Sequence, residues 1–194
     1  VIVGAGFAGM YMLHRLRKLG FNVTVLEAGD GVGGTWYWNR YPGARCDVQS
    51  IDYSYSFDSE LEQEWVWSEK YATQPEILRY ANHVADRFDL RRDIQFETRM
   101  TSAVYDESTH RWTVTTDDGR ALDCQFTIMA SGCLSVPKPM DIEGTEDFSG
   151  KTYHTAHCPS DGVDCRGERV AGIGAGSSAS PVLPWVLDPS AHLC

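Results

Sequence analysis

The sequence opens on Val1-Ile2-Val3-Gly4-Ala5-Gly6-Phe7-Ala8-Gly9, a short apolar run that leads directly into the pattern G-x-G-x-x-G. Apolar residues then recur at helical spacing, and Gly20 stands where a helix commonly ends, so we expect a helix over residues 8–19. An alternating stretch, residues 21–27, predicts a strand that ends at Glu27. The opening therefore predicts a β-α-β unit of the usual length, about 30 residues.

Three glycines and one acid of this unit suit a dinucleotide. Gly4 permits a tight turn, Gly6 lets the backbone approach a pyrophosphate, and Gly9 lets the helix lie close to the strand. The helix N-terminus offers unpaired N–H groups and the positive end of its dipole to phosphates. Glu27 follows Gly9 by 18 residues, where an acid accepts hydrogen bonds from ribose hydroxyls and repels a 2′-phosphate. We therefore expect a site for FAD or NAD here, rather than a simple glycine turn.

The composition is that of an acidic globular protein. The chain has 194 residues, a formal net charge of −10 and 42% hydrophobic residues. The charge argues against a nucleic-acid or membrane partner, because both need a basic face. No apolar run approaches the roughly 20 residues that span a bilayer and no signal peptide is visible, so we expect a cytoplasmic protein. Neither a C-x-x-C pair nor zinc-like spacing occurs, so we expect no metal site and free thiols at Cys46, Cys124, Cys133, Cys158, Cys165 and Cys194.

The middle of the chain mixes irregular and regular segments. Residues 33–71 are rich in aromatics and broken by Gly and Pro, so we expect loop with short elements, packed either as ordinary core or on something large and flat. Thr73-Gln74-Pro75-Glu76 has the pattern of a capping box, and an apolar stripe over residues 77–88 predicts a helix after it. Strands are expected at residues 94–98, 101–105, 111–116 and 122–130.

These strands are expected to form a small meander, with Asp117-Asp118-Gly119 as a hairpin turn between the last two. The meander leads into Ile128-Met129-Ala130-Ser131-Gly132, a buried strand whose small terminal residues let a cofactor approach closely. Beyond it, Pro137-Lys138-Pro139 indicates a domain boundary or a crossover.

A second nucleotide fingerprint lies near the end of the chain. The strand-like run Val170-Ala171-Gly172-Ile173 precedes Gly174-Ala175-Gly176-Ser177-Ser178-Ala179, which fits G-x-G-x-x-A. We expect Pro181 and Pro184 to disrupt the helix that should follow. Two fingerprints suggest two nucleotides, one held and one exchanged.

Together these stretches resemble the N-terminal part of a flavin-containing monooxygenase of the Baeyer-Villiger type, similar to phenylacetone and cyclohexanone monooxygenases. Phe148 to Pro159 resembles the family fingerprint F-x-G-x-x-x-H-x-x-x-W-P, with Cys158 where the fingerprint has Trp. The resemblance stops near Ala179. We therefore interpret the chain as a fragment, with a frameshift or cloning boundary near Ser180 that resequencing of the coding DNA would test. The other matching stretches are Gly4 to Gly9, Gly33 to Trp38, Tyr41 to Asp47, Tyr71 to Ile77 and Met129 to Gly132.

The resemblance implies an α/β fold, in which a Rossmann-like FAD-binding domain belongs to a flavoprotein with two dinucleotide-binding domains. The N-terminal part of the FAD domain would span residues 1–136, and a linker with the fingerprint residues 137–169. A truncated NADPH-binding domain would begin at residues 170–194 and diverge after about residue 179.

The same resemblance implies the cofactor contacts. FAD would be held by Gly4, Gly6, Phe7, Gly9, Glu27, Thr35, Trp36, Trp38, Asp47 and Tyr53. The nicotinamide would lie near Arg45, Cys46 and Asp47, and the NADPH pyrophosphate on Gly174, Gly176, Ser177 and Ser178. His154 would couple NADPH binding to domain movement, the alternative being a surface histidine with a local hydrogen bond. Asp47, whose place beside Arg45 favours a role in the site over a solvated loop carboxylate, would be the catalytic partner of an arginine outside these residues.

The activity implied is that of an FAD- and NADPH-dependent oxidoreductase. In an enzyme of that family NADPH would reduce FAD, and dioxygen would add to the reduced flavin. The resulting peroxyflavin would insert one oxygen atom into a ketone to give an ester or lactone. An N- or S-oxygenating flavin monooxygenase and a non-catalytic flavin-binding fragment stay open as alternatives. A disulfide reductase is disfavoured because no C-x-x-x-x-C pair follows the first fingerprint. The chain by itself is expected to be inactive and poorly soluble, because apolar surface and strand edges would be uncovered.

Overall fold

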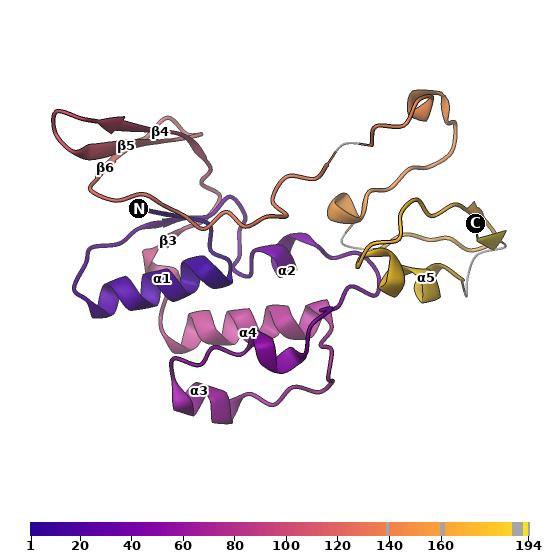
Figure 1. Ribbon diagram of the computed structural model, residues 1–194, viewed down its shortest axis with the longest axis horizontal. Coiled ribbons are helices and arrows are strands. Elements are labelled where there is room, and N and C mark those ends of the chain that lie inside the picture. The colour runs from indigo at the N-terminus through magenta and orange to yellow at the C-terminus, as the bar shows by residue number, and fades with distance from the viewer. Residues whose placement is uncertain (139, 160–161, 188–191, 194) are drawn as a thin grey trace. The chain divides into compact units, whose positions relative to one another are not determined.

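The computed structural model describes residues 1–138, 140–159, 162–187 and 192–193 of the chain (Figure 1). They form two compact units. The first unit consists of Val1–Tyr37 and Leu78–Ser135, and the second of Trp38–Ile77 and Val136–Cys194. Of the cysteines, Cys194 lies outside the described residues and the other five carry free thiols. Pro139 of the expected boundary also lies outside them.

The first unit is built on a four-stranded parallel sheet with the order β3-β2-β1-β7. Helix α1 (Phe7–Lys18) connects β1 to β2, which confirms the predicted β-α-β unit and the α/β fold. The helix ends one residue earlier than expected, and Gly20 follows it with a φ of +83°. The four strands are β1 (Ile2–Val3), β2 (Val25–Leu26), β3 (Ile94–Gln95) and β7 (Ile128–Met129).

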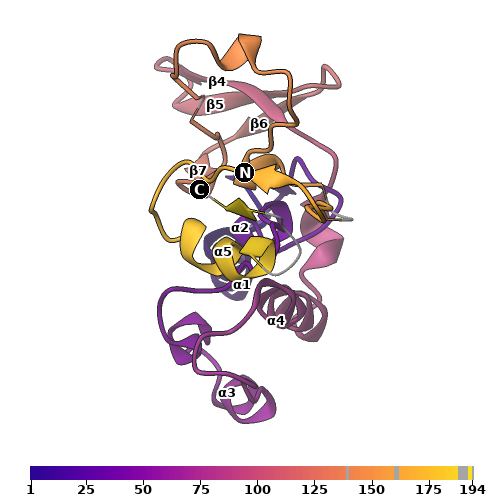
Figure 2. The same cartoon turned by 90° about the vertical axis from the view of Figure 1, so that its right-hand side faces the viewer.

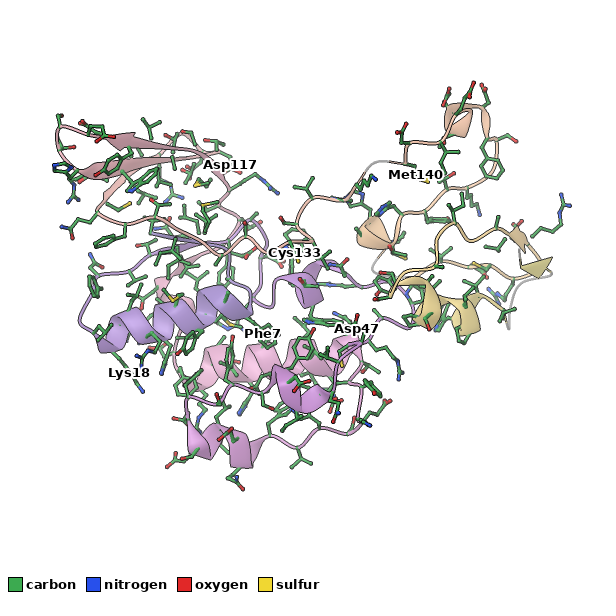
Figure 3. All side chains as sticks on the ribbon, in the orientation of Figure 1. Phe7, Lys18, Asp47, Asp117, Cys133 and Met140 are labelled. Atoms are coloured by element: carbon green, nitrogen blue, oxygen red, sulfur yellow. The ribbon has the colours of Figure 1, made fainter. Side chains whose placement is uncertain are left out.

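One hydrophobic core joins this sheet to two helices. Met10 and Leu13 of α1 are at most 1% exposed and pack with Ile2 of β1. Ala81 and Ala85, from the part of α4 (Gln74–Arg87) that belongs to the first unit, complete the cluster. Figure 3 labels Phe7 and Lys18, which lie at the two ends of α1. Burial of α1 along one face therefore holds its N-terminus next to the end of β1.

A separate antiparallel sheet in the same unit has the order β4-β5-β6 (Figure 2). It consists of β4 (Met100–Asp106), β5 (Arg111–Thr116) and β6 (Ala121–Cys124), and Gly119 makes the predicted hairpin turn with a φ of +82°. The expected assignment of the strand at residues 94–98 to the meander is wrong. Ile94 pairs with Val25 in the parallel sheet, because it is buried on the core that α1 and α4 share.

The second unit contains mostly short elements, as expected for residues 33–71. Helix α2 (Thr35–Trp38) crosses the boundary between the units, and η1 (Ser50–Tyr53) and α3 (Ser59–Glu64) follow it. The remaining elements of this unit are η3 (Thr145–Asp147), η4 (Thr155–His157), β8 (Arg169–Val170), α5 (Ala179–Leu187) and β9 (His192–Leu193). In the first unit, η2 (Arg91–Asp93) precedes β3.

Two expectations about helix ends are wrong. Prolines do not disrupt the segment after the second fingerprint, which forms α5. Pro181 lies in its first turn, where a backbone N–H has no partner within the helix, so only Pro184 removes a helical hydrogen bond. The capping box at α4 is not formed by the Glu76 side chain, because its carboxylate accepts hydrogen bonds from the backbone N–H (2.9 Å) and the hydroxyl (2.8 Å) of Ser68.

Within the described ranges, every helix is too short or too polar to cross a membrane.

Candidate functional site

The glycine loop between β1 and α1 is tightly packed on its own neighbours. A Cβ on Gly9 would collide with the carbonyl oxygen of Gly4, and a Cβ on Gly4 would lie 2.6 Å from the carbonyl oxygen of Ala130. Gly4 also has a φ of +102°, which disfavours any other residue. Gly9 therefore lets the helix approach the strand, as the sequence predicts.

The N-terminus of α1 has no side-chain cap. Gly6 is its N-cap, and the first turn carries no acidic residue. The first N–H groups of a helix have no partner within the helix, and the helix dipole gives them a partial positive charge. Phe7 follows with its ring 6.2 Å from that of Tyr80. This arrangement can accept a phosphate group.

Glu27 ties the loop to the end of β2. Its side chain is buried, one carboxylate oxygen accepts the N–H of Ala5 at 2.7 Å, and the other accepts that of Gly29 at 2.9 Å. Sequence reasoning assigned this acid to a ribose and missed its role in holding the glycine turn. Each carboxylate oxygen has a second lone pair, so accepting ribose hydroxyls is compatible with both bonds.

The aromatic segment begins against the same loop. The N–H of Gly33 donates to the carbonyl of Ala5 at 3.1 Å, and a Cβ on Gly34 would lie 2.8 Å from the Cα of Gly6. Thr35 begins α2 half-buried and Trp36 is buried. The structure thus gathers seven of the candidate residues around the first loop in the first unit: Gly4, Gly6, Phe7, Gly9, Glu27, Thr35 and Trp36.

The other candidate residues belong to the second unit. Trp38, at the end of α2, is 47% exposed, and Tyr53 is the last residue of η1 and is half-buried. His154 caps η4 through its Nδ1, which accepts the N–H of Ala156 at 3.1 Å. That local hydrogen bond is the arrangement expected of a histidine without a role in coupling, although a nucleotide could still be contacted from Nε2.

The segment that carries Arg45, Cys46 and Asp47 is paired with residues 69–74. The N–H of Cys46 donates to the carbonyl of Ala72 at 3.0 Å, and a β-bridge joins Arg45 to Thr73. The Arg45 guanidinium lies 3.2 Å from the carboxylate of Glu69, so its ion pair is with Glu69 and not with Asp47, two residues further along the chain. Asp47 is exposed and has no hydrogen bond of its own within the described residues (Figure 3).

Cys46 is the buried residue of this segment. Its side chain is 3% exposed, and burial raises the pKa of its thiol. A hydrogen bond from the backbone of Ala72 opposes this shift, and the negative charge of Asp47 raises the pKa further. A thiol that resists ionisation is a poor nucleophile, so Cys46 contributes packing rather than thiol chemistry.

The second fingerprint leads into α5 with its glycines in open surroundings. Gly174 has a φ of +110°, and a Cβ at Gly174 or Gly176 would meet no described atom within 4 Å. Ser177 is exposed and Ser178 half-buried. A Cβ on Gly43 would collide with the carbonyl oxygen of Pro181 in α5, so the loop that leads to Arg45 and Asp47 lies against the helix that follows the second fingerprint.

A family model described as pyridine nucleotide-disulphide oxidoreductase matches residues 1–182. Among curated proteins, the chain is similar to an acetone monooxygenase (methyl acetate-forming) of Gordonia sp. (strain TY-5). The two are 49% identical over 182 residues, which is 94% of this chain and 34% of that protein. It is also 46% identical over 179 residues to the phenazine N-monooxygenase PhzNO1 of Lysobacter antibioticus, covering 92% of this chain and 33% of that protein.

Solved structures show the same likeness. The chain superimposes with a TM-score of 0.91 and 58% identity on an oxidized steroid monooxygenase bound to NADP, covering 99% of this chain and 37% of that one. A crystal structure of OTEMO in complex with FAD and NADP gives a TM-score of 0.92 and 41% identity, covering 99% and 37%. The chain thus spans about a third of the length of its relatives. Several relatives are named as ketone-oxidising monooxygenases, so the predicted resemblance is confirmed.

Proposed function

The chain belongs to the pyridine nucleotide-disulphide oxidoreductase family, and from that premise we propose that it forms the FAD-binding part of an NADPH-dependent Baeyer-Villiger monooxygenase. The observation that carries the proposal is the loop from Gly4 to Gly9, whose glycines bring α1 against β1 and leave its N-terminus without a side-chain cap. The relatives whose structures contain FAD and NADP have the same fold over 99% of this chain.

The residues around the first loop fit FAD. We expect the N–H groups at the start of α1 to bind the pyrophosphate and the remaining lone pairs of Glu27 to bind the ribose hydroxyls. Phe7, Thr35, Trp36, Trp38 and Tyr53 would contribute further contacts to the cofactor. When bound, FAD supplies the redox chemistry that transfers electrons from NADPH to dioxygen.

The second unit would bind NADPH. Gly174, Gly176, Ser177 and Ser178 precede α5, and the open space around both glycines leaves room for a pyrophosphate. Arg45, Cys46 and Asp47 would lie along the nicotinamide end, with the carboxylate of Asp47 free to pair with a cation, and His154 would couple NADPH binding to domain movement. In this proposal residues 1–136 belong to the FAD domain, residues 137–169 form a linker, and the NADPH domain begins at residue 170.

The substrate would be a ketone, which is converted with dioxygen to an ester or lactone. Relatives named acetone monooxygenase and cyclopentanone 1,2-monooxygenase support this class. Disulfide chemistry is not proposed in spite of the family name, because no C-x-x-x-x-C pair is present and burial raises the pKa of Cys46. We further propose a cytoplasmic enzyme that binds neither nucleic acid nor membranes, in keeping with the net charge of −10.

The test starts from the full-length protein that carries this sequence. We expect it to purify with a flavin absorption spectrum, to oxidise NADPH faster when acetone or cyclopentanone is added, and to form the ester or lactone, detected by gas chromatography. A protein that binds no flavin would contradict the proposal.

A second candidate activity is oxygenation at nitrogen. It is favoured by the 46% identity to a phenazine N-monooxygenase. Presenting phenazine and cyclopentanone to the same preparation distinguishes the two, because an N-oxide and a lactone differ in mass and chromatographic retention. Formation of the N-oxide without the lactone would replace the ketone assignment.

A further inference from the structure

The segment that carries Arg45 and Asp47 depends on one buried hydroxyl. The Ser50 side chain is 3% exposed. Its Oγ donates to the carbonyl of Glu69 at 2.6 Å and accepts the N–H of Ala72 at 2.8 Å, while its own N–H donates to the carbonyl of Lys70 at 2.8 Å. Ser50 thus makes three hydrogen bonds to one short stretch of the chain, residues 69–72.

Two backbone hydrogen bonds complete the connection on the other side of Asp47. The N–H of Cys46 donates to the carbonyl of Ala72 at 3.0 Å, and that of Gln74 donates to the carbonyl of Ala44 at 2.8 Å. Asp47 therefore lies between two anchored points, Cys46 and Ser50, although its own side chain is exposed. Because no described group holds the Asp47 side chain, the backbone around it decides where its carboxylate points.

Ser50 also affects Arg45 through the same segment. The hydroxyl of Ser50 binds the backbone carbonyl of Glu69, whose carboxylate pairs with the Arg45 guanidinium at 3.2 Å. An exposed ion pair of this kind is weak by itself and orients a side chain only if its backbone is held. The hydroxyl is inaccessible and has both its donor and acceptor roles occupied, so it is unsuited to direct contact with a cofactor.

We propose that Ser50 is a positioning residue, whose buried hydroxyl holds residues 44–50 on residues 69–74 and thereby directs Arg45 and Asp47 toward the nicotinamide cofactor. This inference rests on the proposed function, because it assigns a cofactor to Arg45 and Asp47. It concerns the binding and orientation of NADPH.

The test compares three variants of the full-length protein loaded with FAD. Ser50→Ala removes the hydroxyl, and Ser50→Thr retains it. Thr116→Val is the matched control, because Thr116 is similarly buried at 2% exposure and its hydroxyl also holds a loop, through the carboxylate of Asp118 and the carbonyl of Arg120 in the β5–β6 turn. The readouts are hydrogen exchange by mass spectrometry of peptides that cover residues 44–50 and 69–74, and the kinetics of NADPH oxidation.

For Ser50→Ala we expect exchange in both peptides to become about tenfold faster and the KM for NADPH to rise about tenfold. Ser50→Thr should keep the exchange rate and the KM for NADPH at the values of the unsubstituted protein, even if the added methyl group lowers the melting temperature. Thr116→Val should lower stability without changing the exchange rate of these peptides or the KM for NADPH.

Unchanged exchange in Ser50→Ala would overturn the proposal, as would faster exchange with an unchanged KM. An equal rise of KM in Thr116→Val would also overturn it, because the effect would then follow from stability alone. Failure of the proposed function is distinguishable, since it would show as the absence of NADPH oxidation in the unsubstituted protein.

Discussion

The two glycine fingerprints share a sequence pattern and differ in what surrounds them. In the first, from Gly4 to Gly9, an added Cβ would meet backbone atoms of the same unit at Gly4, Gly6 and Gly9. In the second, from Gly174 to Ala179, an added Cβ at either glycine would meet no described atom within 4 Å. The first set of glycines is therefore required by the packing of the chain itself, whereas the demand for Gly176 would come from a bound nucleotide.

The difference follows from the sheets to which the fingerprints belong. Strand β1 lies between β2 and β7 in a four-stranded sheet, and α1 is pressed onto it by a shared core. Strand β8 pairs with β9 in a two-stranded ladder of two residues each, as far as the described residues extend. A helix that is held on a sheet requires glycine at the crossing, and a helix next to a small ladder does not.

The largest effect is expected from Gly9→Ala. The new methyl group would collide with the Gly4 carbonyl and force α1 away from β1, so we expect the free energy of unfolding to fall by about 3 kcal/mol. Urea denaturation followed by circular dichroism measures this loss. The exposed neighbour in the same turn serves as the control, since Ala8→Ser should change stability by less than about 0.5 kcal/mol. Unaltered stability in Gly9→Ala would show that the glycines of the first fingerprint are not required by the packing of α1 on β1.

A smaller loss is expected from Glu27→Gln. The amide has one acceptor oxygen in place of two, so either the N–H of Ala5 or that of Gly29 loses its partner in a buried site. Losing a hydrogen bond to a charged acceptor should cost about 2 kcal/mol. Thermal denaturation should show this drop, and the exposed Glu168→Gln, just before β8, should melt like the unsubstituted protein. Equal melting of all three proteins would show that Glu27 does not hold the first loop.

Gly174→Ala isolates the cost of backbone conformation in the second fingerprint. The φ of +110° is unfavourable for alanine, although space is available for its methyl group. We expect a loss of about 1 kcal/mol, detectable as faster hydrogen exchange in peptides from residues 169–187. A loss as large as that of Gly9→Ala would indicate close packing that the structure does not show.

The smallest effect on stability, and the sharpest contrast, is expected from Gly176→Ala. This position has neither a positive φ nor a close neighbour, so stability should change by less than about 0.5 kcal/mol. If a pyrophosphate approaches the backbone here, the dissociation constant for NADP, measured by calorimetry, should nevertheless rise about tenfold. An unchanged dissociation constant would show that no ligand comes close to Gly176.

Local patterns predicted much of this structure. The helix after the first fingerprint, the turn at Gly119 and the short elements of the aromatic segment were all predictable from spacing and residue type. The expectations that were wrong depend on partners distant in the sequence. Ile94 joins the parallel sheet because Val25 lies beside it, and Glu76 bonds to Ser68 instead of capping its own helix.

The candidate site shows the same division. Residue types and spacing identified the glycines and Glu27 and predicted two nucleotides, and the resemblance added the segment with Arg45 and Asp47. Sequence reasoning missed Ser50 and Glu69, which are more than 18 residues away from their partners Ala72 and Arg45 and form no recognisable motif. Arg45 and Asp47 lie two residues apart in the sequence, and the structure pairs the Arg45 guanidinium with the carboxylate of Glu69, which no local pattern indicates.

The sequence by itself determined that this chain would build a β-α-β unit with an open helix N-terminus, since glycine conformations, helical periodicity and an acid at a set distance act over short stretches of backbone. The tertiary structure decided which glycines the chain needs for its own packing, where Arg45 finds its counter-ion, and what holds the backbone on either side of Asp47. Those outcomes depend on which segments meet in space, and steric exclusion and hydrogen-bond pairing between segments distant in the sequence arise only when the chain is folded.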